Sequence, residues 1–245
     1  MPSDNLSKLS KDQIYHIRQR VLSVAQEYMV TCGDNQPVCF ATRSRYYLRS
    51  LAIGVLWLTA VITCIGVLID AAPGSYVLAI LILTGAVGFS CFLYPKRHIE
   101  FFADEAKKNL LWRAEQESKM QFIFAHYRVK TADGTVLGRI SKNHFTDFLR
   151  KKWTCRDEQD NVIFFAYEDS IILALLRRFL GNFYGLLRTH FIYTTPEQSI
   201  VIADFNRDFT LRDHYTLKLD PAPVPHPDGR LLLTMGVILD TGERR

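Results

Sequence analysis

A run of three basic residues is the feature of this sequence whose chemistry is easiest to name. Arg150, Lys151 and Lys152 are consecutive, and Arg139 and Lys142 precede them in a segment of strand-like composition. Each Lys or Arg near an anionic lipid surface contributes about 1 kcal/mol to binding. These five residues are therefore the candidate site for lipid headgroups. A solvated charged face explains the same residues and is the alternative.

The motifs of the common enzyme classes are missing from the sequence. It contains no G-x-S-x-G, G-x-x-x-x-G-K-[ST], G-x-G-x-x-G or H-E-x-x-H pattern, and its seven histidines are well separated. The five cysteines are scattered, with no C-x-x-C pair and no histidine at zinc-finger spacing. We therefore expect a protein that is not an enzyme and that holds no cofactor and no structural metal.

Two apolar runs lie close together in the sequence, at residues 51–69 and 76–94. Each is about 20 residues long, the length that an α-helix needs to cross roughly 30 Å of hydrocarbon. Neither run contains Asp, Glu, Lys, Arg or His, and the short connection between them includes Pro73 and Gly74, which suit a tight turn. The sequence predicts a transmembrane helical hairpin, assigned to residues 46–95.

Charges beside the two runs predict the orientation of the hairpin. Arg43, Arg45 and Arg49 precede the first run, and Lys96 and Arg97 follow the second, whereas the turn is acidic. Lys and Arg are retained on the cytoplasmic side, so we expect a two-span protein of the cell membrane with both termini in the cytoplasm. The net charge of +5 favours an anionic partner but is too small to indicate nucleic acid.

Four stretches share one layout, in which an aromatic residue opens an alternating segment, a polar turn follows, and a second apolar segment ends the unit. They are residues 28–42, 127–141, 153–167 and 191–205. Strand-like composition around a turn, clearest at Asp133 and Gly134, predicts β-hairpins. Repeated hairpins imply an antiparallel sheet that closes into a barrel or a sandwich. We expect one discontinuous domain, with its first strands in residues 1–45 and the remainder in residues 120–245.

Four other segments have apolar patterns of their own. The spacing in residues 14–28 fits a helix or a strand, and the hairpin that follows favours the strand. Residues 97–119 have a narrow apolar face without Gly or Pro, which predicts a cytoplasmic helix, assigned to residues 96–119. Residues 170–180 predict a short helix that packs in the core or lies at a lipid interface. The run at 231–239 is too short to cross a membrane and should be buried in protein.

These features together resemble a known family, the tubby C-terminal-like superfamily, and most closely its phospholipid-scramblase and LURP-related branches. The likeness covers roughly residues 13–42 and 120–241. It implies a mainly β fold, a closed antiparallel β-barrel of about twelve strands around a C-terminal apolar helix at 231–239. The motifs that carry it are the hairpin repeats, the segment Gly138 to Lys142, the segment Asp213 to Leu217, and the apolar run 231–239 with Asp240 after it.

Two features of the scramblase branch have no counterpart in this sequence. One is a Cys-rich acylated segment, and the other is an acidic, calcium-associated loop before the terminal helix. In the corresponding region Asp208, Asp213 and Asp220 are spread apart among Arg207 and Arg212, a poor arrangement for calcium. The resemblance therefore implies the fold more than the scrambling activity.

The sequence thus predicts a membrane-anchored, tubby-like or scramblase-like domain that is not an enzyme and binds anionic phospholipid at the cytoplasmic membrane face. Two alternatives stay open. One is a membrane-tethered scaffold that binds a protein partner or associates with itself through the spans. The other is a calcium-independent phospholipid scramblase. Salt-sensitive binding to anionic liposomes favours lipid over a protein partner.

Overall fold

The structure of this chain, a computed structural model, describes residues 14–20, 26–33, 35–43, 46–69, 74–119, 124–143, 151–169, 190–197, 199–207, 214–220 and 227–243. The chain forms two compact units. One unit, which includes Arg97–Glu117, is a β-barrel with a helix inside it. The other, which includes Arg45–Lys96, is a pair of apolar helices.

Twelve described strands form one closed barrel in which all neighbouring strands are antiparallel. The order around the barrel is β1-β12-β11-β10-β9-β8-β7-β6-β5-β4-β3-β2, so β1 closes against β12 and both edges of every described strand are paired. The strands are β1 (Ile14–Arg20), β2 (Gln26–Cys32), β3 (Pro37–Arg43), β4 (Ile99–Phe102), β5 (Leu110–Gln116), β6 (Phe124–Thr131), β7 (Val136–Asn143), β8 (Lys152–Arg156), β9 (Val162–Glu168), β10 (His190–Thr194), β11 (Val201–Arg207) and β12 (His214–Leu219).

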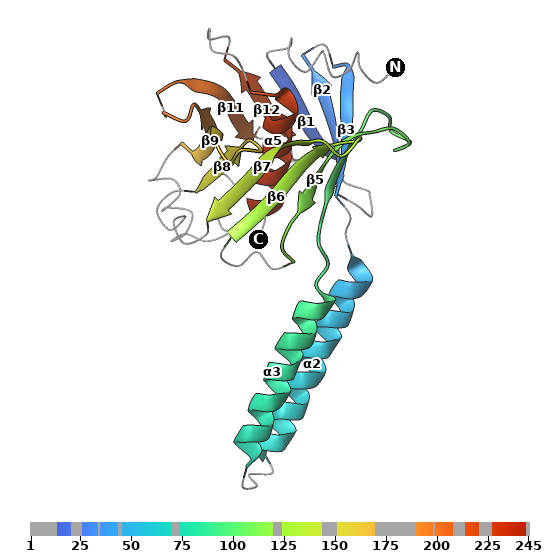
Figure 1. The fold of residues 1–245 in the computed structure, drawn as a ribbon. Helices are drawn as coiled ribbons and strands as arrows, with labels where there is room; N and C mark the ends of the chain where they lie inside the picture. The colour runs from blue at the N-terminus through green and yellow to red at the C-terminus, as the bar shows by residue number, and fades with distance from the viewer. Residues whose placement is uncertain are drawn as a thin grey trace. The chain divides into compact units, whose positions relative to one another are not determined.

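The inside of the barrel is filled by helix α5 (Gly229–Glu243) (Figure 1). Residues 231–241 of this helix are all buried. A helix that is apolar on all sides has to be covered on all sides, and the inward side chains of the strands provide that cover. In β6, for example, Ala125, Tyr127 and Val129 are buried and the residues between them are not. The predicted closed antiparallel barrel around a C-terminal apolar helix is confirmed.

Polar groups tie α5 to the barrel wall at two levels. The indole N–H of Trp112 donates to Thr234 Oγ1 at 2.9 Å. Near the end of the helix, the buried Asp240 carboxylate accepts hydrogen bonds from the hydroxyl of Tyr28, at 2.5 Å, and from the hydroxyl of Tyr215. A buried charge is tolerated only when it is hydrogen-bonded. These contacts therefore fix both the depth and the rotation of α5 in the barrel.

The second unit is a pair of helices, α2 (Tyr47–Ile69) and α3 (Ser75–Leu93), each long and apolar enough to cross a membrane. Small residues are buried where the two helices meet, among them Ala60 and Ala79. The Cys64 thiol lies 3.6 Å from the carbonyl oxygen of Ala79, to which it donates. Most of the other apolar side chains of both helices are exposed, so only a small part of either surface is covered by protein.

The helix predicted at 96–119 is wrong. This segment forms β4, a turn and β5, and both strands belong to the barrel. Phe101 and Trp112 point inward and stack with their ring centroids 4.6 Å apart. Asp104 closes the turn by accepting hydrogen bonds from two backbone N–H groups, at 3.0 and 2.8 Å. Pairing with β3 and β6 outweighs the local helical pattern, because strand formation depends on packing partners more than on intrinsic preference.

The apolar helices interrupt the barrel in sequence but not in space. Residues 14–20 form strand β1, the form favoured for this ambiguous segment. Strands β3 and β4 pair directly, with Ala41 opposite Phe101, although α2 and α3 lie between them in the sequence. The two helices are thus an insertion between adjacent strands.

The helix predicted at 170–180 lies outside the described residues.

The enclosure of α5 predicts that Val237→Asp prevents stable folding of the barrel. Val237 is fully buried, so the substitution places an unpaired charge in the core at a cost of several kcal/mol, comparable to the stability of a domain. Val201→Asp is the matched control, because Val201 is 37% exposed. Near-ultraviolet circular dichroism melts of the full chain in detergent should show a lost or strongly lowered transition for Val237→Asp alone. Equal melting temperatures would contradict the buried helix.

The hydrogen bond to Asp240 predicts different costs for two tyrosine substitutions. Tyr28→Phe removes a donor to a buried charge and should lower the free energy of unfolding by about 1.5–3 kcal/mol. Tyr193 is equally buried, but its hydroxyl has no hydrogen-bond partner among the described residues, and burial raises its pKa well above the usual value. Tyr193→Phe should therefore be neutral or stabilising. Denaturant unfolding measures the free energy of unfolding of both variants. An equal decrease in the two variants would show that the hydrogen bond from Tyr28 to Asp240 adds no more stability than the unpartnered Tyr193 hydroxyl.

Candidate functional site

The structure separates the basic residues that the sequence grouped. Arg139 and Lys142 are both on β7, but side chains alternate along the strand, so Arg139 faces outward and Lys142 faces inward. Lys142 is only 5% exposed, and its ammonium lies 5.2 Å from the centroid of the Trp153 ring. Lys142 is thus packed on the inner face of the barrel wall. Arg150 lies outside the described residues.

Arg139 and Lys152 also lie apart, although both face outward. Arg139 is opposite Arg156 in the β7–β8 register, and Lys152 precedes Arg156 by four residues in β8. Four residues of strand correspond to about 13 Å. Of the predicted set, only Lys151 and Lys152 stay together among the described residues.

Strand direction shows at which end of the barrel these two lysines lie. We define the connection end as the end where β3 stops and β4 starts, because the chain leaves the barrel there for α2 and returns there from α3. All neighbouring strands are antiparallel, so odd-numbered strands end and even-numbered strands begin at this end. Lys151 and Lys152, at the start of β8, therefore lie at the connection end. The opposite end is called the far end.

Lys151 and Lys152 are held by their neighbours on β9. The backbone N–H of Glu168 donates to the carbonyl oxygen of Lys151 at 3.1 Å. The Lys152 ammonium lies 3.6 Å from the centroid of the Phe165 ring, a distance typical of a cation–π contact. Both lysine residues are partly exposed. The Lys152 charge therefore has a defined place at the surface, and the backbone of Lys151 is held beside it by β9.

A row of three arginines crosses the outer face of β6, β7 and β8. Arg128 is opposite Arg139, and Arg139 is opposite Arg156. Like charges directly opposite one another destabilise a sheet, so this row needs compensation. Glu117 Oε1 lies 2.6 Å from Arg128 and 3.6 Å from Arg139, and the carboxylate of Asp160 lies 3.3 Å from Arg156. The sequence analysis selected only Arg139 from this row.

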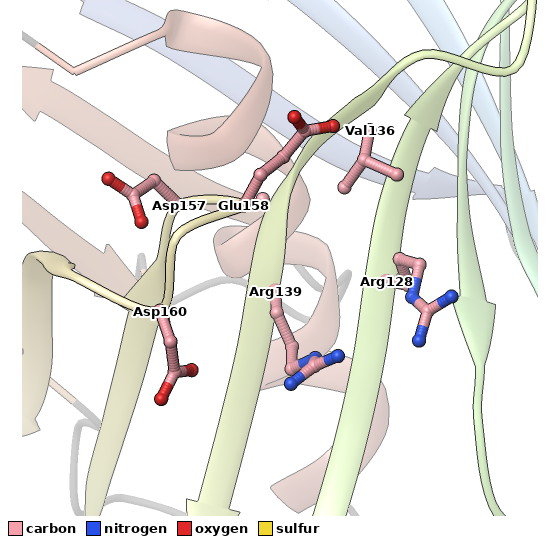
Figure 2. A pocket seen from close by; sticks show the side chains of 7 residues that line it. Arg128, Val136, Arg139, Asp157, Glu158 and Asp160 are labelled. Carbon is pink, nitrogen blue, oxygen red and sulfur yellow. The ribbon is translucent and has the colours of Figure 1, made fainter.

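A pocket of about 330 Å³ opens beside this row at the far end (Figure 2). Pairing between β7 and β8 stops at Arg139 and Arg156, and Arg156 is the last residue of β8. The backbones of β7 and β8 approach closely at this point, because a Cβ atom on Gly138 would lie only 2.6 Å from the carbonyl oxygen of Arg156. The pocket is lined by Arg128, Val136, Gly138 and Arg139 from the strands and by Asp157, Glu158 and Asp160 from the β8–β9 turn.

The turn brings three carboxylates to the pocket. Asp157 accepts hydrogen bonds from the backbone and side-chain nitrogens of Asn161, which lower the pKa of its carboxyl and keep it ionised. Asp160 has a positive φ of 67°, an uncommon backbone conformation for a residue with a side chain. Glu158 forms no ion pair with any described residue, and its side chain extends from the turn across the start of β7 (Figure 2). The sequence analysis did not select these residues.

Within the described part of the chain, no cluster of three or more His, Cys, Asp or Glu side chains has a geometry that could hold a metal ion. Burial raises the pKa of the Cys39 and Cys155 thiols far above the usual value, so these two are held as neutral thiols. Of the three aspartates weighed for calcium, Asp208 and Asp213 lie outside the described residues. The charged surfaces at the two barrel ends are therefore the candidate sites.

No protein-family model matches this chain, and neither does any curated protein or any solved structure with which it was compared.

Proposed function

We propose that this protein is a membrane-anchored barrel that binds anionic phospholipid through the connection end. The observation that carries the proposal is the position of Lys151 and Lys152 at the same end of the barrel as the two links to α2 and α3. A binding surface near an anchor needs little affinity of its own, because the tether keeps the local concentration of its ligand high. The function is non-enzymatic in this proposal.

The exposed surfaces of α2 and α3 support the anchor. Large apolar side chains such as Leu48, Leu58 and Phe92 are more than half exposed on these helices. A soluble protein rarely exposes a continuous apolar surface of this kind, and a bilayer would cover it. The basic residues on both flanks of the hairpin favour a cytoplasmic barrel in the cell membrane.

The links between the barrel and the helices support the choice of end. Residues 44–46 join β3 to α2, and residues 94–98 join α3 to β4. An extended chain spans at most about 3.6 Å for each residue, so the longer link reaches roughly 20 Å. The connection end is thus the end of the barrel that the chain tethers to the two helices by short links.

We further propose that the barrel is a tubby-like domain, as the sequence motifs suggested. The closed barrel of twelve strands around a buried C-terminal helix supports this assignment. Lys142 is left out of the binding set because it is buried on the inner face.

The topology in this proposal is tested with two cysteine variants in intact cells. Tyr76→Cys, at the start of α3, should react with a membrane-impermeant maleimide from outside, because Tyr76 is 75% exposed beside the turn between the spans. Ala132→Cys, in an exposed turn of the barrel, should react only after permeabilisation. The unmodified chain gives the background from its five native cysteines. Labelling of Ala132→Cys in intact cells would refute the cytoplasmic barrel.

Lipid binding is tested by exchanging Lys151 and Lys152 for glutamine in the full chain. The chain is placed in phosphatidylcholine nanodiscs with or without phosphatidylserine, and native mass spectrometry counts the lipids that it retains. Each lysine should contribute about 1 kcal/mol, so the double variant should lose most of the preference for phosphatidylserine. Added salt should weaken the preference of the unmodified chain as well.

The matched control for this experiment removes two lysines from the far half of the barrel, Lys130 and Lys218. It changes the net charge equally and should leave the preference intact. Equal effects of the two double variants would show that charge alone matters and would refute a site at the connection end. Absence of any preference in the unmodified chain would favour a protein partner instead.

A further inference from the structure

We propose that the barrel also touches the lipid acyl chains, through an aromatic rim at the connection end. The rim consists of Phe124 on β6, Lys152 on β8 and Tyr167 on β9. The proposal rests on the proposed function in one respect, which is that the connection end faces the bilayer. It does not depend on anionic lipid, because contact between apolar groups is independent of headgroup charge.

Strand pairing places the rim residues in one row on the outer surface of the barrel. Phe124 is opposite Asn143, the last residue of β7, and Lys152 is opposite Tyr167. The β7–β8 pairing places Asn143 beside Lys152. Each of the four has a buried neighbour in its own strand, so all four side chains point outward. The row therefore occupies the outward positions of β6 to β9 that are nearest the connection end.

Phe124 supplies most of the apolar surface of the rim. Of the large apolar side chains in the described part of the barrel unit, it has the largest exposed fraction, 49%. Its ring stacks on the imidazole of His126, with the ring centroids 6.0 Å apart, so the ring is held in place on the outer wall. One exposed phenylalanine is common on protein surfaces. Its place beside Lys152 and Tyr167 at the tethered end is what points to a membrane.

The combination of aromatic rings with a lysine matches the membrane–water interface. Aromatic rings are enriched there at headgroup level, and lysine stems lie along apolar surface while the ammonium stays in water. In the rim, the Lys152 ammonium lies 3.6 Å from the centroid of the Phe165 ring. A soluble protein partner could also cover such a surface. The bilayer is the better match, because the links to α2 and α3, two helices apolar enough to span it, leave the barrel from this end.

The far end of the same strands has a different character. The last outward residues of β6 and β8 there are Lys130 and Arg156. Lys130 lies 2.7 Å from a carboxylate oxygen of Glu115, and Arg156 lies 3.3 Å from one of Asp160. Moving ion pairs out of water carries a large desolvation cost. Of the two ends of β6 and β8, the connection end is therefore the one suited to contact with acyl chains.

The test is the quenching of tryptophan fluorescence at position 124 by brominated lipid. Phe124→Trp is made in a full chain that also carries Trp57→Phe, which removes the native tryptophan of α2. The other two tryptophans, Trp112 and Trp153, are buried in the barrel. The chain is placed in phosphatidylcholine nanodiscs with bromine on the acyl-chain carbons nearest the headgroup, and no anionic lipid is present. Phe124→Trp should lose fluorescence relative to nanodiscs without bromine.

Val201→Trp in the same Trp57→Phe chain is the matched control. Val201 is 37% exposed and is the first residue of β11, at the far end. Bromine should leave its fluorescence unchanged. Thermal melts verify that both variants fold. Equal quenching of the two variants, or quenching of neither, would overturn the rim, and quenching of Val201→Trp alone would place the opposite end at the membrane.

The result at position 124 is separable from the role of the two lysines in the proposed function. Quenching at position 124 in a chain that shows no preference for phosphatidylserine would support the rim and refute lipid selection by Lys151 and Lys152. A preference for phosphatidylserine without quenching at position 124 would overturn the rim and leave the lysine site in place.

Discussion

The barrel depends on one constraint, which is that residues 231–239 of helix α5 are buried on every side and almost all apolar. Such a helix cannot lie on the surface of a sheet, because part of it would remain exposed to water. Twelve paired strands enclose it completely, and the same closure removes open strand edges. The few polar groups on the helix have specific partners: Thr234 meets Trp112, and Asp240 meets Tyr28 and Tyr215. These contacts therefore allow the helix only one position relative to the strands that surround it.

Much of the fold could be predicted because local patterns and tertiary packing agree. Hairpin turns and alternating residues in 127–141 and 153–167 became β6 to β9 with few changes. The apolar runs became α2 and α3, and the run at 231–239 became the buried part of α5. In β6, for example, buried and less buried residues alternate with the period of two that the sequence pattern predicts.

Less of the candidate sites could be predicted, because they depend on register between strands. The segment 96–119 has a helical pattern, yet it pairs as two strands once β3 and β6 lie beside it. Lys142 is close to the other basic residues in sequence, but strand alternation turns it inward. Alternation within one hairpin would have placed Arg128 opposite Arg139, whereas the pairing of Arg139 with Arg156 depends on a register that no short turn fixes.

The pairing of β1 with β12 has a consequence for the order of events during synthesis. Ile14 pairs with Lys218, so the barrel closes only after nearly the whole described chain has been made. At about 5–20 residues per second, β12 follows β1 by roughly 10–40 s. During this interval α2 and α3 have already emerged, while the early strands still lack both a closing neighbour and the core that α5 supplies. The two apolar helices are therefore synthesised before the barrel exists as a stable fold, and the exposed strand edges have to be protected until α5 is synthesised.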